Sequence, residues 1–501
     1  MRKRERWGTK LGIILAVAGS AVGIGNFLRF PGKVALNGGG AFMIPYFISF
    51  LILGIPLSWV EWSLGRYGGQ FSHGSAPGIF HSIWKNKIAK YLGVIGLFGP
   101  LVIFFYYVYI ESWSLGYAFF SITGKLLKNS NPDSMKKFLE NFQLNPLNGA
   151  YYFFLITFIL NFYILYRGIS KGIEKICEIG MPILAILGIL LVVRVFTLRS
   201  GERTVVDGLN FLWMPDFKAI LEPKVWLEAA GQIFFTLSVG IGVILTYASY
   251  LDRKSDIALS ALSSSATNEF FEVIIGGSFV IPAAFIFFGE QTKSIAEGGI
   301  FNLGFVTMPL VFQKIPLGSL ISFLWFVLLF IAGFTSSISI LQPAISFFED
   351  EFKFSKSKSV LITALICFIF SQPAIFFIDK GVVDELDFWG GTLALVIFAL
   401  IEVIIFAWIL DIEESWKELH IGADIKIPEF FKFIIKYVTP IYLIIILLYW
   451  VIKNGIPLLI LKGVSKENLP YILGIRVALF LFFILLIFMV RYIWKKRGEV
   501  L

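Results

Sequence analysis

The sequence predicts an all-α polytopic membrane protein that crosses the bilayer twelve times. Hydrophobic residues make up 57% of its 501 residues and charged residues 15%, against about 25% charged in soluble domains. The mean hydropathy of +0.80 supports the same class. Because a helix needs about 20 apolar residues to cross the hydrocarbon core, the long apolar segments predict the spans. They lie near residues 11–36, 41–69, 88–123, 149–167, 174–197, 225–252, 258–288, 318–350, 358–378, 385–409, 429–452 and 470–493.

The distribution of charge predicts that both termini are cytoplasmic. Basic residues gather within residues 2–10 and again within 491–497, and loops rich in Lys and Arg stay in the cytoplasm. We therefore expect a protein of the cytoplasmic (inner) membrane, surrounded by lipid, with an even number of spans. The loops at 124–149 and 198–224, which this topology places outside, also hold several basic residues. Since the membrane explains the net charge of +9, we expect no nucleic acid as a partner.

Three long connections differ in character. Residues 124–148 are polar and turn-rich, whereas residues 289–317 alternate glycine, proline and apolar residues. The second composition is too apolar for a mobile loop and predicts a re-entrant or capping hairpin over the outer face. Residues 410–428 are charged, and we expect them in the cytosol.

The middle of the first span is unusual for a helix that only has to cross lipid. Gly19, Gly23 and Gly25 fall within seven residues, and Asn26 and Arg29 follow. Glycine weakens a helix, and an arginine inside the membrane is costly. One interpretation is close helix packing through Gly19 and Gly23, which match the GxxxG pattern. The third glycine, the amide and the cation favour a helix that is broken at mid-membrane, with free backbone groups facing a ligand.

The sixth span repeats this feature. Residues 232–242 place hydroxyl residues, Gly240 and Gly242 at the middle of an apolar helix. Two interrupted helices five spans apart indicate an inverted repeat of five plus five helices, with helices 1 and 6 broken around a central site. The alternative is a second packing seam. The repeat would divide the chain into residues 1–197 (spans 1–5), residues 198–409 (spans 6–10) and residues 410–501 (spans 11 and 12 with the cytosolic end).

Polar residues inside other spans offer mainly oxygen ligands. Glu61, Glu111, Asn268 and Glu272 all interrupt apolar segments, and several spans carry hydroxyls. A single hydroxyl in a membrane helix usually bonds its own backbone. Together, however, carbonyls, amides and hydroxyls without a Cys or His cluster suit a hard cation rather than zinc, copper or haem. Because these residues include few carboxylates, the set favours a monovalent ion over a divalent one. The three histidines fall in loops, so we expect no catalytic residues, no enzyme and no organic cofactor.

Several of these stretches resemble the neurotransmitter:sodium symporter family. The matching segments are residues 19–31, 37–46, 61–69, 106–113, 232–238, 246–250 and 333–337. Similarity runs from about residue 7 to the last span and is weakest in the loop 124–148 and in spans nine, eleven and twelve. The resemblance implies the LeuT-like fold of that family, with an amino acid and two sodium ions bound between spans one, three, six and eight.

The resemblance also implies ligands for each ion. Around the first sodium ion, together with the substrate carboxylate, it places Ala21, Asn26, Thr236 and Asn268. Around the second sodium ion it places the carbonyls of Gly19, Val22 and Ala332 and the hydroxyls of Thr335 and Ser336.

The implied substrate site uses the same two interruptions. The substrate carboxylate would meet N–H groups near Ile24 and Gly25 and the hydroxyl of Tyr107, which agrees with the positive end of a half-helix opening there. The ammonium would meet carbonyls of Ala21, Phe235 and Thr236 and the hydroxyl of Ser238. Besides Ser336, the residues expected around the substrate side chain are Ser20, Ile24, Ile103, Ile241 and Ile340. This apolar lining predicts a neutral aliphatic side chain.

Gates follow from the resemblance as well. The outer gate would pair Arg29 with Asp387, while Phe235 closes over the substrate. The inner gate would pair Arg4 with Asp350, near Trp7, Ser249 and Tyr250. Glu61 would brace the broken sixth helix. Glu272 occupies the position of the chloride site in chloride-dependent relatives, so the resemblance implies independence of chloride.

The function expected from the sequence is sodium-coupled symport of a neutral, apolar amino acid by alternating access. One alternative is an exchanger of the same fold that is driven by protons or by a counter-substrate. Another is an amino-acid sensor that binds without transport. A homodimer, the transport stoichiometry and the preferred amino acid stay open at this stage.

Overall fold

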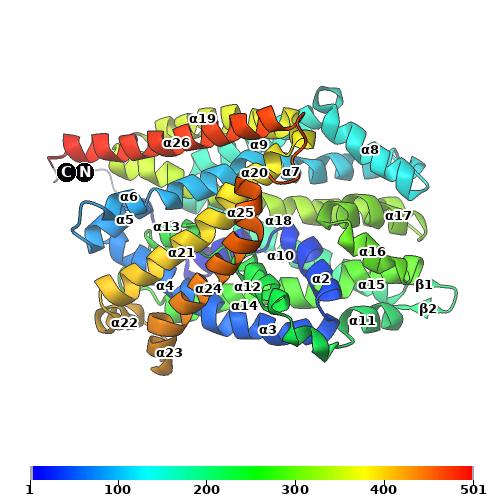
Figure 1. The fold of residues 1–501 in the computed structure, drawn as a ribbon, viewed down its shortest axis with the longest axis horizontal. Helices are drawn as coiled ribbons and strands as arrows, with labels where there is room; N and C mark the ends of the chain where they lie inside the picture. The colour runs from blue at the N-terminus through cyan, green and yellow to red at the C-terminus, as the bar shows by residue number, and fades with distance from the viewer. Residues whose placement is uncertain (1–3, 499–501) are drawn as a thin grey trace.

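The structure, a computed structural model, describes residues 4–498 as a bundle of helices that run side by side (Figure 1). Ten helices in this part of the chain are long and apolar enough to cross a membrane. An eleventh span forms if Lys10–Ala21 and Ile24–Leu36 are taken together, with a bend of 52° between them. All eleven coincide with predicted spans, which confirms the all-α membrane class. The remaining predicted span, the sixth (residues 225–252), consists of two shorter helices, and the count of twelve remains a prediction.

The described residues contain twenty-six α-helices and one small β-hairpin. The first half of the chain holds α1 (Lys10–Ala21), α2 (Ile24–Leu36), α3 (Met43–Ser49), α4 (Ile55–Gly69), α5 (Ala76–Ile83), α6 (Ala89–Leu92), α7 (Ile95–Ile122), α8 (Pro132–Leu144), α9 (Ala150–Arg167), α10 (Lys175–Phe196), β1 (Arg199–Ser200), β2 (Arg203–Thr204), α11 (Val205–Trp213), α12 (Pro223–Leu237) and α13 (Val243–Ala248). The second half holds α14 (Ala258–Glu269), α15 (Gly277–Phe288), α16 (Gln291–Glu297), α17 (Met308–Gln313), α18 (Gly318–Ser346), α19 (Lys356–Phe376), α20 (Val382–Leu386), α21 (Leu395–Ile404), α22 (Ile412–His420), α23 (Phe430–Phe433), α24 (Thr439–Trp450), α25 (Ile456–Leu459) and α26 (Leu469–Lys496).

Short π-helical and 3₁₀ segments connect many of these helices. The π-helical segments are η2 (Phe50–Gly54), η5 (Ile169–Glu174), η7 (Phe270–Gly276), η8 (Asn302–Thr307), η9 (Phe347–Glu351), η11 (Asp387–Ala394), η12 (Ile405–Ile409), η13 (Ile434–Val438) and η14 (Val451–Gly455). The 3₁₀ segments are η1 (Gly39–Phe42), η3 (Leu126–Lys128), η4 (Pro146–Asn148), η6 (Phe217–Leu221) and η10 (Ile378–Lys380).

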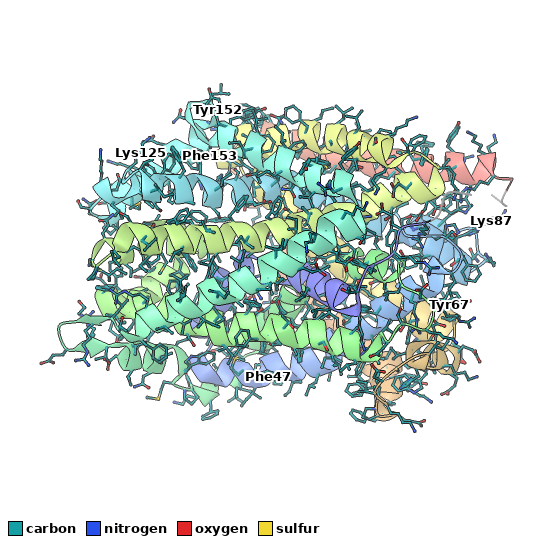
Figure 2. All side chains as sticks on the ribbon, turned by 180° about the vertical axis from the view of Figure 1, so that it is seen from behind. Phe47, Tyr67, Lys87, Lys125, Tyr152 and Phe153 are labelled. Atoms are coloured by element: carbon teal, nitrogen blue, oxygen red, sulfur yellow. The ribbon has the colours of Figure 1, made fainter. Side chains whose placement is uncertain are left out.

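Spans three and eight form the centre of the bundle. In Ala89–Ile122 and Gly318–Glu351, 89% and 78% of the most apolar stretch is buried, against 28% in Leu469–Lys496. Along the two long edges of the bundle, apolar side chains such as Phe47 and Tyr152 point outward (Figure 2) and stay 45% and 65% exposed. An exposed apolar surface of this kind is what a lipid-facing helix presents.

The first predicted break lies between α1 and α2. The helix α1 ends at Ala21, and Val22 and Gly23 adopt extended backbone conformations before α2 begins at Ile24. The Val22 N–H still bonds the Ala18 carbonyl, which closes the last turn of α1. The broken helix that the glycines favoured is therefore present at the expected residues.

The second break occupies residues 238–242, between α12 and α13. Three residues there have positive φ: Ser238 (54°), Gly240 (73°) and Gly242 (85°). This left-handed region favours glycine because a Cβ atom crowds the following carbonyl. The two glycines thus allow the chain to leave one helix and re-enter another within five residues.

The connections are more regular than their sequences suggested. The expectation of a turn-rich loop at 124–148 is wrong over Pro132–Leu144, where α8 is capped by Asn131 and buries Met135, Leu139 and Phe142. Residues 289–317 form α16, η8 and α17, in agreement with the predicted hairpin. These elements lie at the same end of the bundle as α8 and the β-hairpin (Figure 1).

The first and last described segments meet at the opposite end. Arg4 and Arg497 both contact Asp350, at distances of 3.0 Å to its carboxylate and 3.0 Å to its carbonyl. Both ends of the chain therefore lie on one side of the bundle, as an even number of spans requires. Residues 2 and 3 of the basic N-terminal cluster lie outside the described residues.

Candidate substrate and ion site

The two helix breaks face each other inside the bundle. The Ser238 hydroxyl donates to the Ser20 carbonyl at 2.9 Å, and both residues are almost fully buried. A Cβ atom on Gly25 would lie 2.4 Å from the ring of Phe235, so that ring rests directly on the start of α2. The two breaks therefore lie against each other inside the bundle.

A cluster of amides and hydroxyls borders this site. The Asn26 amide donates to Asn268 Oδ1 at 2.8 Å and to Thr236 Oγ1 at 3.0 Å, and the Asn268 amide donates to Thr236 Oγ1 at 2.9 Å. Asn26 Oδ1 accepts from the Gly23 N–H at 2.8 Å. Three of the four residues predicted for the first sodium ion therefore touch one another. The fourth, Ala21, is buried at the end of α1.

Glu272 belongs to the same cluster. It is fully buried on η7 and accepts hydrogen bonds from Gln232 Nε2 at 2.7 Å, from Asn26 Nδ2 at 3.1 Å and from the Thr236 hydroxyl. From the sequence, this residue was expected as a polar group inside span seven and as the equivalent of a chloride site. The structure places its carboxylate against two of the residues predicted to bind sodium.

The residues predicted for the second sodium ion lie where α1 meets α18. A Cβ atom on Gly19 would lie 3.3 Å from Thr335 Cβ. The Thr335 hydroxyl bonds the carbonyls of Ile331 and Ala332 at 3.1 and 3.2 Å, the self-bonding that hydroxyls in membrane helices usually show. Val22 and Ser336 are both buried, at the end of α1 and on α18.

The donor set fits the cation that the sequence predicts. Both clusters offer carbonyl, amide and hydroxyl oxygens, the ligands of hard cations. Among residues 4–498, no group of three or more His, Cys, Asp and Glu side chains is placed to hold a metal ion. Ligand sets typical of zinc are therefore not found in this part of the chain.

The predicted substrate contacts come from four spans. The Tyr107 hydroxyl would lie 3.2 Å from a Cβ atom on Gly23, beside the first N–H groups of α2. Ile24 packs against Gly333 of α18, 3.5 Å from the position of its missing Cβ. The remaining predicted side-chain contacts are also buried, with exposures of 1–7%: Ser20, Ile103, Ile241, Ser336 and Ile340.

The predicted outer gate residues do not pair with each other. Within residues 4–498, no ion pair joins Arg29 to Asp387; the Arg29 guanidinium lies 4.4 Å above the Phe235 ring instead. Asp387 accepts a hydrogen bond from the Tyr106 hydroxyl at 2.6 Å. Cation–π stacking of this kind keeps Arg29 directly over the aromatic ring that rests on Gly25.

One ion pair near this gate was missed from the sequence. Lys33 on α2 pairs with Glu228 on α12 at 2.5 Å, with both side chains about one quarter exposed. Lys33 follows Arg29 by one helical turn, and Glu228 precedes Phe235 by two turns. The sequence did hold a signal for this pair: a lysine follows the break in span one and a glutamate precedes the break in span six. Charged residues inside membrane spans usually pair with one another.

We predict that this ion pair couples the outer halves of spans one and six modestly. A double-mutant cycle with Lys33→Gln and Glu228→Gln should give a coupling energy of about 0.5–1 kcal/mol, as for other partly exposed pairs. Thermal unfolding of the detergent-solubilised protein measures it. The control pair is Lys136 and Glu140, which are 3.9 Å apart, one turn apart on α8 and largely exposed, and it should give a smaller coupling of at most about 0.3 kcal/mol. Equal coupling in both pairs would contradict the assignment.

The two residues predicted for the inner gate pair with each other. Arg4 pairs with Asp350 at 3.0 Å, donates to the Ser249 carbonyl at 2.7 Å and to the Ser249 hydroxyl at 2.9 Å, and stacks 4.4 Å above the Tyr250 ring. The Trp7 indole donates to the Tyr247 carbonyl at 2.9 Å. These contacts join the N-terminal segment to the inner halves of spans six and eight.

Glu61 lies against the second break. Its carboxylate is fully buried and accepts the Gly240 N–H at 2.5 Å, inside residues 238–242. A broken helix leaves N–H groups without intrahelical partners, and a carboxylate is a strong acceptor for them. The contact gives the buried carboxyl group of Glu61 on α4 a hydrogen-bond partner.

Comparison with known proteins agrees with this geometry. The model of the sodium:neurotransmitter symporter family matches residues 4–143 and 143–495. An uncharacterized sodium-dependent transporter of Methanocaldococcus jannaschii is 32% identical over 452 residues, which cover 88% of this chain and 89% of that protein. One of Haemophilus influenzae is 30% identical and covers 89% and 98%. The crystal structure of MhsT in complex with L-phenylalanine is similar at 30% identity, with a TM-score of 0.78, over 89% of this chain and 99% of that one.

Proposed function

Because the chain belongs to the sodium:neurotransmitter symporter family, we propose that it couples transport of a neutral, aliphatic amino acid to two sodium ions. That it is a multi-pass membrane protein and a sodium-dependent symporter, and no enzyme, follows from the family and the relatives. Our proposal adds the substrate class, two ion sites, independence of chloride, cytoplasmic termini in the inner membrane, and a repeat divided after residues 197 and 409. The main support for this proposal is that the two helix breaks face each other beside the cluster of Asn26, Thr236, Asn268 and Glu272.

The start of α2 supplies the proposed carboxylate site. The first N–H groups of a helix have no intrahelical partner and sit at the positive end of its dipole. The N–H of Gly23, the residue before α2, is bonded to Asn26, and the N–H groups of Ile24 and Gly25 at the start of α2 would bind the substrate. The Tyr107 hydroxyl beside Gly23 would donate to the same carboxylate.

The ends of α1 and α12 supply the proposed ammonium site. The last carbonyls of a helix carry partial negative charge, so those near Ala21, Phe235 and Thr236 attract a cation. Phe235 also covers the site from outside, because its ring rests on Gly25. The isoleucines beyond would receive an apolar side chain and leave a charged one without a partner.

Sodium would supply the positive charge that compensates the substrate carboxylate. At the first site the residues to hold it are Ala21, Asn26, Thr236 and Asn268, and at the second Gly19, Val22, Ala332, Thr335 and Ser336. Asn26 serves two functions in this arrangement: it caps α2 through Gly23 and contributes an amide oxygen. Substrate and ion binding are therefore linked, and linkage between two sites is reciprocal.

The gates support alternating access. Arg4 and Asp350 are joined on the cytosolic side, while Arg29 and Asp387 have separate partners on the outer side. A paired inner gate and an unpaired outer gate correspond to a state in which the path to the cytosol is shut. Transport would then require the outer pair to close before the inner pair opens.

We expect sodium-dependent binding of radiolabelled leucine to the purified protein. Binding should be strong in sodium and weak in potassium, and unchanged when chloride is replaced by gluconate. Alanine, valine, isoleucine and methionine should compete in graded order, since each methylene in an apolar pocket changes binding by about 1–3 kcal/mol. Phenylalanine belongs in the series because MhsT binds it. If phenylalanine is the best competitor, the proposed aliphatic class is wrong.

A proton-driven or counter-substrate exchanger is the second candidate, and one observation favours it. Glu272 lies inside the oxygen cluster, where protonation would change the charge next to Asn26 and Thr236. Equal leucine binding in sodium and potassium would support this candidate. Uptake into proteoliposomes separates both from a sensor, because a sensor binds leucine without accumulating it.

A further inference from the structure

A buried carboxylate outside the gates holds the start of the first helix. Glu174 ends η5 in span five and is 3% exposed. Its Oε2 accepts the Gly8 N–H at 2.8 Å, and its Oε1 accepts the Thr9 N–H at 2.9 Å and the Thr9 hydroxyl at 3.1 Å. Three hydrogen bonds therefore tie span five to the N-terminal end of α1.

The position of this carboxylate is suited to its charge. N–H groups at the start of a helix lack intrahelical partners, and the helix dipole favours an anion there. A Cβ atom on Gly12, one turn into α1, would lie 2.1 Å from Glu174 Oε1. Only glycine at residue 12 lets α1 approach this closely, so the carboxylate and the helix fit each other.

The same face of span five continues to the proposed second ion site. Residues 174, 177 and 181 are spaced for one face of a helix. A Cβ atom on Gly19 would lie 3.3 Å from Cys177 Sγ and 3.4 Å from Met181 Sδ, and equally 3.3 Å from Thr335 Cβ across the site. One seam between span five and α1 thus runs from Glu174 to Gly19.

Other contacts of the N-terminal segment are more exposed. Lys10 pairs with Asp256 and Asp424 but is 47% exposed, and Glu5, which bonds the Ile169 N–H and Lys356, is 37% exposed. Exposed ion pairs contribute little, whereas a buried and fully bonded carboxylate is costly to separate from its donors. Besides the contacts of Arg4 and Trp7, the buried Glu174 carboxylate is therefore a stronger attachment of this segment than these exposed ion pairs.

We propose that Glu174 is a positioning residue that holds the cytosolic end of α1 closed, and that its release is coupled to departure of the second sodium ion. The proposal rests on the proposed function, because it takes Gly19 and Thr335 as ligands of that ion. Sodium holds one end of the seam and Glu174 the other. Breaking either end makes the other easier to break, because the two act on one rigid helix.

Cys177 offers a reporter within the seam. It is fully buried between Glu174 and Gly19, and Cys367 is the second cysteine of the chain. In full-length protein carrying Cys367→Ala, the rate of labelling by a membrane-impermeant methanethiosulfonate reagent measures how often the seam opens. The test compares Glu174→Gln with Glu178→Gln, one turn further on, whose carboxylate is 3.4 Å from exposed Lys175.

In potassium, we expect Glu174→Gln to label about tenfold faster than the parent, within the usual range of coupling between sites. The sodium concentration that halves the rate should rise by a similar factor, and Glu178→Gln should match the parent. Glu174→Asp, which keeps the charge, should lie between them and replaces the glutamine variant if that variant does not fold. If both Glu174 variants label at the same rate as the parent and are protected by the same sodium concentration, the proposal is overturned. If sodium protects no protein, including the parent, the second sodium site itself is refuted.

Discussion

Replacing Asn26 by alanine should weaken substrate and sodium binding together, each by about 100-fold, or about 2.7 kcal/mol. The side chain bonds Gly23, Asn268, Thr236 and Glu272. Alanine removes the partner of the Gly23 N–H and of Asn268 Oδ1, whereas Thr236 and Glu272 keep other partners. Each buried group left unsatisfied costs about 1–3 kcal/mol. It also removes an oxygen proposed to bind the ion that compensates the substrate carboxylate.

Equilibrium binding of radiolabelled leucine at several sodium concentrations measures both affinities. Asn210→Ala is the control, because Asn210 lies exposed on α11 far along the chain from the breaks. Full affinity for both ligands in Asn26→Ala would disprove the shared site. Loss of leucine binding with unchanged sodium binding, measured by scintillation with ²²Na, would show that the amide serves only the substrate.

Gly240→Ala should destabilise the folded protein by about 2–5 kcal/mol. Its φ of 73° costs an alanine about 1–2 kcal/mol. In addition, the new Cβ would lie 2.6 Å from the Leu395 carbonyl, and forcing atoms into a packed interior costs about 1–3 kcal/mol. Relief of that contact would move residues 238–242 and separate the Gly240 N–H from Glu61, so the damage reaches the site.

The matched control is Gly201→Ala. Gly201 also has a positive φ, 61°, but nothing lies within 4 Å of its Cβ position in the β-hairpin. Thermal unfolding followed by size-exclusion chromatography should show a small loss for Gly201→Ala and a large one for Gly240→Ala. Similar losses would mean that backbone strain alone matters and that the approach of α21 does not.

The helices and their breaks were predictable because they depend on local sequence. Apolar runs of sufficient length marked the spans, and glycines marked interruptions within residues 19–25 and 232–242, which the structure places at residues 22–23 and 238–242. The amphipathic helix α8 was not predicted, because polar residues and Pro132 suggested turns; its regularity comes from burying Met135, Leu139 and Phe142 against the rest of the protein.

Contacts between spans were harder to predict. Three of the residues predicted for the first sodium ion, Asn26, Thr236 and Asn268, were named as neighbours only through the resemblance, since Asn26 and Asn268 are 242 positions apart. Arg29 was expected opposite Asp387, yet it lies over Phe235. The partner of a charge depends on how helices rotate and pack, and hydropathy and spacing carry no information on that.

The ring of Phe235 has two neighbours, and this has a mechanical consequence. The ring packs against Gly25, and the Arg29 guanidinium stacks on the same ring. A movement of the ring away from Gly25 would therefore also break its contact with the Arg29 guanidinium. A movement of the guanidinium would in turn remove one of the two contacts that hold the ring. We therefore expect the Phe235 ring and the Arg29 guanidinium to move together, so that a change at the arginine also alters the packing of the ring on Gly25.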